Sequence, residues 1–240
     1  PKPFRSPMLE TDMLRSSNIV AMCLLLVACT PAKPVIDEQM MRIDGEMPAD
    51  FSGSWERDYS RGDDVNQVLR DIYYYLSRTS ADRAYTTRPG PVQPSSRDWQ
   101  SISALARLAE LITRPQVLTV SQNDQEITVD RKDDFSLLCA FYDGVAKGTE
   151  SDYGTEICGW DGDQLVSHLV LPDGLQVTHR FTASADQKQL RVVTTVSSNT
   201  ARVPVTLTRF YKKFERLPPD FNCIETLSMK RVCSTGEIEF

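Results

Sequence analysis

Cysteine and histidine side chains offer the most distinctive chemistry in this sequence. There are six cysteines and two histidines among 240 residues. A thiol can be acylated, oxidised to a disulfide or bound to zinc, and an imidazole serves as a metal ligand or a proton-transfer group. Two cysteines lie in or directly after an apolar N-terminal stretch, and four lie in the more polar remainder of the chain. The two are Cys23 and Cys29, and the four are Cys139, Cys158, Cys223 and Cys233.

Cys29 follows a segment with the features of an export signal. Residues 13–18 form a short basic segment, and residues 19–28 are ten apolar residues without a charge. This length fits the apolar part of a signal peptide and is too short for a membrane-spanning helix, which needs about 20 residues. Translation is expected to start at Met13, with Met8 as the alternative.

The end of this segment, Leu26-Val27-Ala28-Cys29, resembles a bacterial lipobox. The resemblance implies cleavage before Cys29 and acylation of its thiol, after which two or more acyl chains hold the protein at a membrane. Thr30 follows the cysteine, and in lipoproteins of Gram-negative bacteria the lack of Asp at this position implies sorting to the outer membrane, facing the periplasm. We therefore expect a lipid-anchored outer-membrane lipoprotein. The alternative is an ordinary signal peptide cleaved elsewhere, or a buried apolar helix.

Four cysteines in an exported domain predict two disulfides, for which three connectivities exist. We favour the local pairs Cys139–Cys158 and Cys223–Cys233, because each could join neighbouring strands or strand ends. Zinc is disfavoured because no C-x2-C spacing occurs and neither histidine lies near the C-terminal pair. A catalytic thiol is disfavoured as well.

His168 and His179 are the candidates for a histidine-based metal site. If Asp173-Gly174 forms a two-residue turn, the two histidines lie opposite each other on one hairpin. A bulged three-residue turn instead places His168 opposite Thr178. Two histidines still lack the further ligand and the open position of a catalytic zinc site. We interpret them as structural and expect no metal or other cofactor.

Two other groups of side chains suggest ligand binding at first sight. The loop expected at residues 143–154, with Glu156 beside it, is acidic but lacks the EF-hand spacing, so we interpret it as a solvated loop. Tyr73, Tyr74 and Tyr75 could form a stacking platform, but successive helical residues point about 100° apart. We expect Tyr73 to join an apolar stripe and its two neighbours to flank the core.

The composition and the motifs weigh against several function classes. The chain has 27 Lys and Arg against 33 Asp and Glu, a formal net charge of −6, which is unlike a nucleic-acid-binding protein. No motif of a nucleotide-binding loop, a serine hydrolase or a zinc protease occurs. We therefore expect that the protein is not an enzyme.

Residues 50–216 are predicted to form the globular domain. Apolar residues recur at helical spacing in residues 63–76 and 98–112, and mostly with a period of two after residue 115. About nine strands are predicted, at residues 54–59, 117–120, 126–129, 135–141, 157–160, 164–171, 175–182, 189–196 and 203–214. Such a meander closes most naturally into an up-and-down antiparallel β-barrel, here with a two-helix insert, residues 62–114, after the first strand.

The rest of the chain is divided by composition. Residues 1–12 are interpreted as upstream, non-native sequence, and residues 13–28 as the lipoprotein signal peptide. Residues 29–49, with three prolines, are expected to be an extended tether. Residues 217–240 are expected to be a C-terminal extension stapled by a disulfide.

Gly53-Ser54-Trp55 lies on the first predicted strand and Arg209 on the last long strand. These residues resemble the lipocalin (calycin) pattern. In lipocalins the Trp of such a G-x-W motif is packed by a late Arg. The runs at residues 160–165, 190–193 and 208–211 are similar to lipocalin-like domains of uncharacterised bacterial exported proteins. The likeness covers the strands and leaves out the helical insert.

Two functions are compatible with this reasoning. The first is a non-enzymatic, lipid-anchored protein that binds a small apolar ligand in or at the mouth of its barrel. The alternative is a structural or interaction lipoprotein with a filled barrel and a protein partner. An apolar cavity of about 300 Å³ or more favours the first. An interior packed with side chains such as Trp55 and Phe181 favours the second.

Overall fold

The computed structural model describes residues 35–84, 95–131, 136–152, 154–215, 222–224 and 232–234. The chain divides into two units, residues 1–35 and residues 36–240, and all that follows concerns the second. The signal peptide, Cys29 and Thr30 lie outside the described residues. The expectations about them stay predictions.

The described elements are a series of strands with one helical insert after the first strand. In chain order they are β1 (Gly53–Gly62), α2 (Val65–Ala84), α3 (Ser96–Ile112), β2 (Val117–Gln122), β3 (Glu126–Arg131), β4 (Leu137–Tyr142), β5 (Val145–Lys147), β6 (Thr149–Ser151), β7 (Gly154–Asp161), β8 (Gln164–Val170), the 3-10 turn η1 (Pro172–Gly174), β9 (Gln176–Ala183), β10 (Gln189–Ser197), β11 (Val205–Phe214), β12 (Asn222–Ile224) and β13 (Val232–Ser234).

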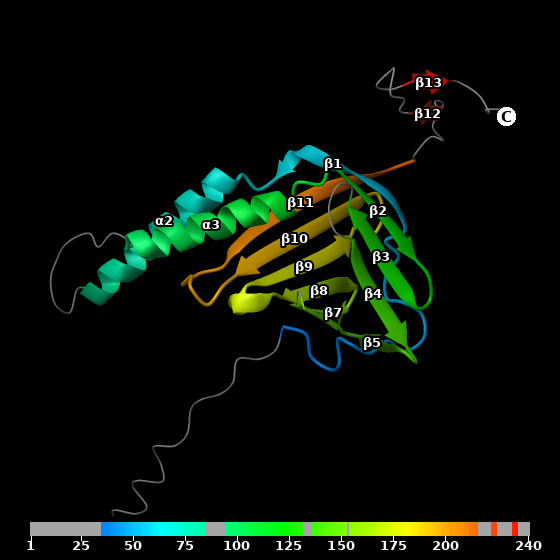
Figure 1. Ribbon diagram of the computed structural model, residues 1–240, viewed down its shortest axis with the longest axis horizontal. Helices are drawn as coiled ribbons and strands as arrows, with labels where there is room; N and C mark the ends of the chain where they lie inside the picture. Colours follow the sequence, from blue (N-terminus) through cyan, green and yellow to red (C-terminus); the bar gives the residue numbers. More distant parts are fainter. Residues whose placement is uncertain are drawn as a thin grey trace, which may run out of the picture. The chain divides into compact units, whose positions relative to one another are not determined.

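Eleven of these strands form one antiparallel sheet in the order β5-β4-β3-β2-β1-β11-β10-β9-β8-β7-β6. The sheet curls into a nearly closed barrel (Figure 1). The predicted β-barrel with a helical insertion is therefore confirmed, with eleven strands in place of about nine. The added strands, β5 and β6, lie in the acidic segment expected to be a loop. With three residues each, they are too short to show an alternating apolar pattern in the sequence. Pairing with β4 and β7 makes them strands.

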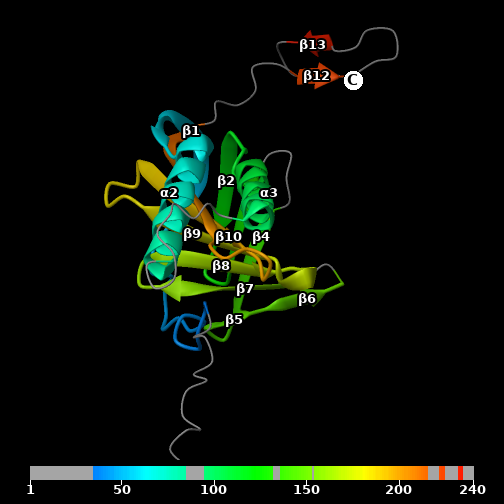
Figure 2. The same cartoon turned by 90° about the vertical axis from the view of Figure 1, so that its left-hand side faces the viewer.

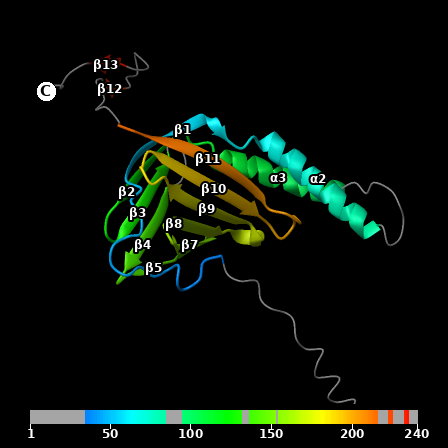
Figure 3. The same cartoon turned by 180° about the vertical axis from the view of Figure 1, so that it is seen from behind.

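The barrel interior is filled by side chains that alternate along the strands. Trp55 on β1 is 0% exposed, and Phe181 on β9 and Tyr211 on β11 are buried beside it in the same cluster. On β10 every second residue from Leu190 to Val196 is buried and faces the interior. Figure 3 shows β1 and β11 side by side, so the first and last long strands are neighbours in the wall.

The two helices cover the far end of this inward sheet face. Ile102 and Ala109 of α3 and Leu76 of α2 form a second buried cluster with Val196 of β10 and Val205 of β11. The start of each helix is capped by a side chain. The Ser95 hydroxyl accepts the Asp98 N–H at 3.1 Å at the start of α3, and Asp64 accepts two backbone N–H groups at the start of α2. Helical spacing thus orients both inward faces toward the sheet.

The barrel closes along a line that we call the seam, between the β4–β5 pair and the β6–β7 pair. β5 pairs with β4 and β6 pairs with β7, and Gly148 alone separates β5 from β6 in sequence. Figure 2 shows β5 and β6 following each other along the edge below β7. The chain therefore crosses the seam without forming a ladder across it in the described residues.

An N-terminal segment, residues 36–49, which we call the strap, binds both sides of the seam (Figure 1). The Met41 carbonyl accepts the Ala146 N–H of β5 at 2.7 Å, and the Met40 carbonyl accepts the Trp160 N–H of β7 at 2.6 Å. Apolar side chains of the strap also pack on the barrel core, namely Met41, Ile43, Met47 and Ala49. The extended tether expected at residues 29–49 is therefore wrong for residues 36–49, because the open edges of β5 and β7 bind them.

A disulfide crosses the seam inside the barrel. Cys139 of β4 and Cys158 of β7 are bonded, as predicted, and both are buried in the main core cluster. The bond joins β4 and β7, which are not hydrogen-bonded neighbours, across the seam, whereas the sequence suggested neighbouring strands or strand ends. Cys223 and Cys233 are directly opposite in the β12–β13 hairpin. Their side chains lie outside the described residues, so their bond stays a prediction.

Removing the seam disulfide tests its contribution to closure. The variant Cys139→Ala/Cys158→Ala frees a loop with a sequence separation of 19, and we expect the free energy of unfolding to fall by about 3 kcal/mol or less. Urea unfolding measures this change, and amide exchange at Ala146 and Trp160 is expected to quicken. Cys223→Ala/Cys233→Ala is the control that leaves exchange at the seam unchanged. An unaltered urea midpoint in the first variant contradicts the role of the bond.

A second substitution tests the strap. A Cβ added at Gly159 lies 2.5 Å from the Met40 carbonyl oxygen, so Gly159→Ala is expected to push the strap away and cost about 1–3 kcal/mol. At Gly148 the nearest atom to an added Cβ is 3.4 Å away, so Gly148→Ala is the matched control. Urea unfolding and amide exchange at Trp160 separate the two variants. Equal stability and exchange in both rule out the proposed contact.

Candidate functional site

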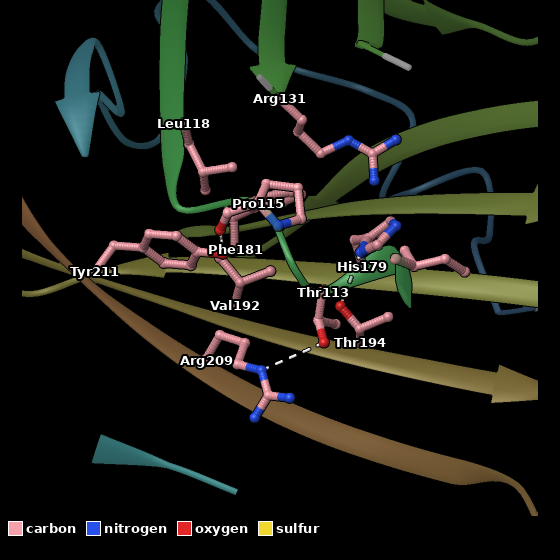
Figure 4. A pocket seen from close by; sticks show the side chains of 11 residues that line it. Thr113, Pro115, Leu118, Arg131, His179, Phe181, Val192, Thr194, Arg209 and Tyr211 are labelled. Atoms are coloured by element: carbon pink, nitrogen blue, oxygen red, sulfur yellow. Dashed lines mark hydrogen bonds between the residues drawn. The ribbon is translucent and has the colours of Figure 1, made fainter. Parts of the chain in front are cut away.

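The barrel interior holds a cavity of about 20 Å³ close to the end of α3. This is enough space for one water molecule. Figure 4 shows the lining side chains, which are Ile112, Thr113, Pro115, Leu118, Arg131, His179, Phe181, Val192, Thr194, Arg209 and Tyr211. The cavity is far below the size of a site for a small organic ligand, about 300 Å³ or more.

Polar groups around this cavity are paired with one another. His179 Nδ1 lies 2.9 Å from Thr194 Oγ1, and the Tyr211 hydroxyl donates to the Pro115 carbonyl at 3.3 Å. Burial, and then the nearby charge of Arg131, lower the pKa of His179 to about 3. Burial raises the pKa of Tyr211 to about 12. Both side chains are therefore neutral at physiological pH.

The histidines do not form a pair. His168 lies opposite Thr178 and bonds to its hydroxyl at 2.9 Å, while His179 lies opposite Ser167. The facing arrangement expected from a two-residue turn is therefore wrong, and the bulged register is observed. The reason is the η1 turn, in which Asp173 adopts φ 63° and a third residue enters the loop. Alternation along β8 and β9 then places the two imidazoles on opposite faces of the sheet.

Trp55 of the G-x-W motif is buried in the core, but the cation next to its ring is Lys213 and not Arg209. The Trp55 indole N–H donates to the Phe51 carbonyl at 2.8 Å, and Lys213 Nζ lies 5.3 Å from the Trp55 ring centre. Gly53 has φ 123°, a conformation that favours glycine. Trp55 is directly opposite Lys213, whereas Arg209 is opposite Gly62 beyond a bulge in β1. The expected packing of Trp55 by Arg209 is therefore wrong.

Arg209 instead helps to hold the helices on the barrel. Its Nε donates to the Thr113 hydroxyl at 3.3 Å, and its Nη1 donates to the Asp63 carbonyl, just before α2. Arg57 of β1 donates to the carbonyl of Thr113, the residue that caps the end of α3, at 3.4 Å. Two guanidinium groups from the barrel wall thus satisfy groups at the helix ends.

A larger, open cleft of about 290 Å³ lies at this junction. Its lining residues are Arg57, Arg107, Glu110, Leu111, Arg114 and Arg209, and we call it the arginine cleft. Arginines from β1, α3, the turn after α3 and β11 line this cleft. Sequence reasoning missed this site. The spacing of Arg107, Glu110 and Arg114 along the second helical segment was the available signal, and the other two arginines are brought there by the sheet topology.

The tyrosine run is more exposed than expected. Tyr73, Tyr74 and Tyr75 are 37%, 60% and 57% exposed. Tyr73 meets the ring edges of Tyr74 and Trp99 and lies outside the buried stripe of α2, which corrects its expected place in the core. Since α2 runs on to Ala84, these side chains are in the middle of the helix.

Comparison with protein-family models, curated proteins and solved structures found no match to this chain. Within the described ranges, no group of three or more His, Cys, Asp or Glu is arranged to hold a metal ion. Across the same residues, none of the helices combines the length and the apolar character that crossing a bilayer requires.

The buried His179 predicts a pH dependence of stability. Its pKa is about 3 in the fold against 6.5 for the unperturbed group, so between these values the unfolded chain binds a proton that the folded chain does not. The free energy of unfolding is expected to fall as the pH drops from about 6.5 to about 4.5, by up to about 1.4 kcal/mol per pH unit.

The variant His179→Leu/Thr194→Val removes both partners together and is expected to flatten this slope. Urea unfolding across the pH range measures the slope. His168→Gln is the control that keeps the contribution of His179, although burial lowers the pKa of His168 as well. A wild-type slope in the double variant contradicts the assignment to His179.

Proposed function

We propose that this chain is a non-enzymatic, lipid-anchored lipoprotein on the periplasmic side of the bacterial outer membrane. Its barrel serves as a rigid interaction module and does not enclose a ligand. The filled interior is the observation that carries the proposed role of the barrel. Among the described residues, the cavity found in the interior has a volume of about 20 Å³, and large side chains such as Phe51, Trp55 and Phe141 are fully buried there.

An apolar ligand enclosed in the barrel is the less favoured alternative. A drug-sized ligand needs a pocket of about 300 Å³ or more, mostly apolar. The interior cavity that the described residues form is smaller by an order of magnitude, and Arg131, His179 and Arg209 line it. Ligand entry would displace packed aromatic side chains and buried polar pairs, which is costly. Binding groups are instead concentrated on the outside.

The outer features that favour an interaction role lie on and beside the helices. Tyr74 and Tyr75 expose more than half of their surface on α2, and Arg107 and Arg114 project from the end of α3. Aromatic and arginine side chains are the residue types enriched at protein interfaces. The acyl chains at Cys29 and the leader before it supply the proposed location.

The anchor is tested by substitution of its thiol. Cys29→Ala is expected to abolish acylation and signal-peptide cleavage, so that the mature form disappears and precursor accumulates, as globomycin also causes for the wild type. Cell fractionation with immunoblotting and mass measurement of the N-terminal peptide report both effects. Cys23→Ala is the matched control, because it removes a thiol of the leader and leaves the mature protein intact. Normal maturation of Cys29→Ala refutes the lipoprotein part of the proposal.

The filled barrel is tested by native mass spectrometry of the protein released from its own membrane in detergent. The expected mass is that of the chain from Cys29 with its acyl groups and no further small molecule. A retained apolar ligand that is lost when Phe181 is changed to Trp, which would overfill the interior, overturns this part and restores the carrier alternative.

A further inference from the structure

The arginine cleft concentrates positive charge in an acidic protein. Four arginines and one acidic residue, Glu110, line the cleft in a chain with a formal net charge of −6. The carboxylate of Asp63 also acts electrostatically on Arg209. Among the described residues, Arg107 and Arg114 have no ion-pair partner. Both are exposed on the rim of the cleft. Such a local excess of one charge sign marks a place where an oppositely charged ligand is favoured.

Two of the four arginines are held in place before any ligand arrives. Arg209 is 5% exposed, and its bonds to Thr113 and Asp63 fix its guanidinium at the junction. Arg57 is held by the Thr113 carbonyl at 3.4 Å and by the ring of Tyr59, whose centre is 4.9 Å from its Cζ. Groups that are already ordered lose little conformational freedom when they bind.

The end of α3 does not balance this charge by itself. A helix C-terminus carries about half a negative charge, which favours nearby cations. That partial charge, Glu110 and the Asp63 carboxylate together still leave an excess of positive charge at the four arginines. The charge of Arg57, after burial, also lowers the pKa of Arg209, in keeping with the closeness of the two cations. A bound anion would relieve this repulsion.

We propose that the arginine cleft is a binding site for a phosphate monoester group. A phosphate monoester carries between −1.5 and about −2 charges at neutral pH and presents three acceptor oxygens. Its tetrahedral oxygens accept hydrogen bonds from guanidinium groups that approach from several elements, whereas a single carboxylate is satisfied by one arginine fork. The cleft volume of about 290 Å³ holds the phosphate together with a small organic group, which Leu111 contacts.

This inference goes beyond the proposed function and does not depend on the lipid anchor. The test is isothermal titration calorimetry on the full chain in detergent, with glycerol 3-phosphate as the probe and acetate as the comparison anion. The wild type is expected to bind the phosphate and to bind acetate at least about tenfold more weakly, since hydrogen bonds to charged groups each change an affinity by about tenfold. Equal affinity for both anions overturns the assignment.

Three variants separate the site from general electrostatics. Arg107→Gln/Arg114→Gln is expected to weaken phosphate binding by about tenfold or more. Arg97→Gln removes a positive charge from the exposed start of the same helix, and is expected to leave the affinity unchanged. Glu110→Gln removes the one carboxylate of the cleft and is expected to tighten binding, a gain that misfolding cannot produce. An unaltered affinity in the double variant, or no gain with Glu110→Gln, overturns the proposal.

The same phosphate chemistry occurs on a soluble molecule and on a lipid headgroup. The two sources are distinguished with the Cys29→Ala chain and phosphatidylcholine vesicles with and without phosphatidic acid. Because this chain keeps its apolar leader, the measured quantity is the difference in binding between the two kinds of vesicle. Binding of glycerol 3-phosphate alone assigns a soluble ligand, and additional binding to phosphatidic acid that Arg107→Gln/Arg114→Gln abolishes assigns the headgroup. Absence of both overturns the site.

Discussion

Closure of the barrel along the seam is the constraint on which the rest of the structure depends. A curled sheet that stops short of closure leaves two edges with unpaired backbone groups, which are prone to pairing with other chains. Here the edges at β5 and β7 are joined by backbone hydrogen bonds to the strap at Met40 and Met41 and by the Cys139–Cys158 bond. The strap joins the two edges by backbone hydrogen bonds and the disulfide joins them covalently, and both lie at the seam.

A closed and packed barrel changes what the helices can do. With the interior occupied, the wall is a rigid support on which Arg57 and Arg209 fix the ends of α2 and α3. The same two side chains border the open cleft outside, so a group that stabilises the fold also shapes the surface. Of the two cavities described here, the larger is therefore at the junction between barrel and helices and not at the centre of the barrel.

The sequence predicts those parts of the fold that carry a local pattern. Alternation from Leu190 to Val196 identifies β10, and helical spacing identifies α2 and α3. The strap was missed because its apolar residues are mixed with charges after a proline-rich start, so it has the composition of a linker. Its burial depends on edges formed more than a hundred residues later. The pairing of Cys139 with Cys158 was found from their spacing, but their place across the seam was not.

Register and charge clustering were harder to predict because they depend on single backbone conformations. The left-handed Asp173 shifts β9 by one position relative to β8, and the bulge in β1 moves Arg209 away from Trp55. The arginine cleft needs residues from positions 57 to 209, and no window of sequence contains them together. Such sites depend on the topology of the sheet. Local sequence patterns indicate the strands and helices but do not determine which distant residues meet.

The pairing of the strap has a consequence for the order in which the chain is assembled. Met40 emerges from the ribosome long before Trp160, its hydrogen-bond partner about 120 residues later, and β1 must wait for β11. Contacts of such long sequence separation form slowly. If the chain is exported as proposed, the first part to cross the inner membrane is among the last to be buried. Its methionines and isoleucines then stay exposed to solvent at least until β7 has followed them.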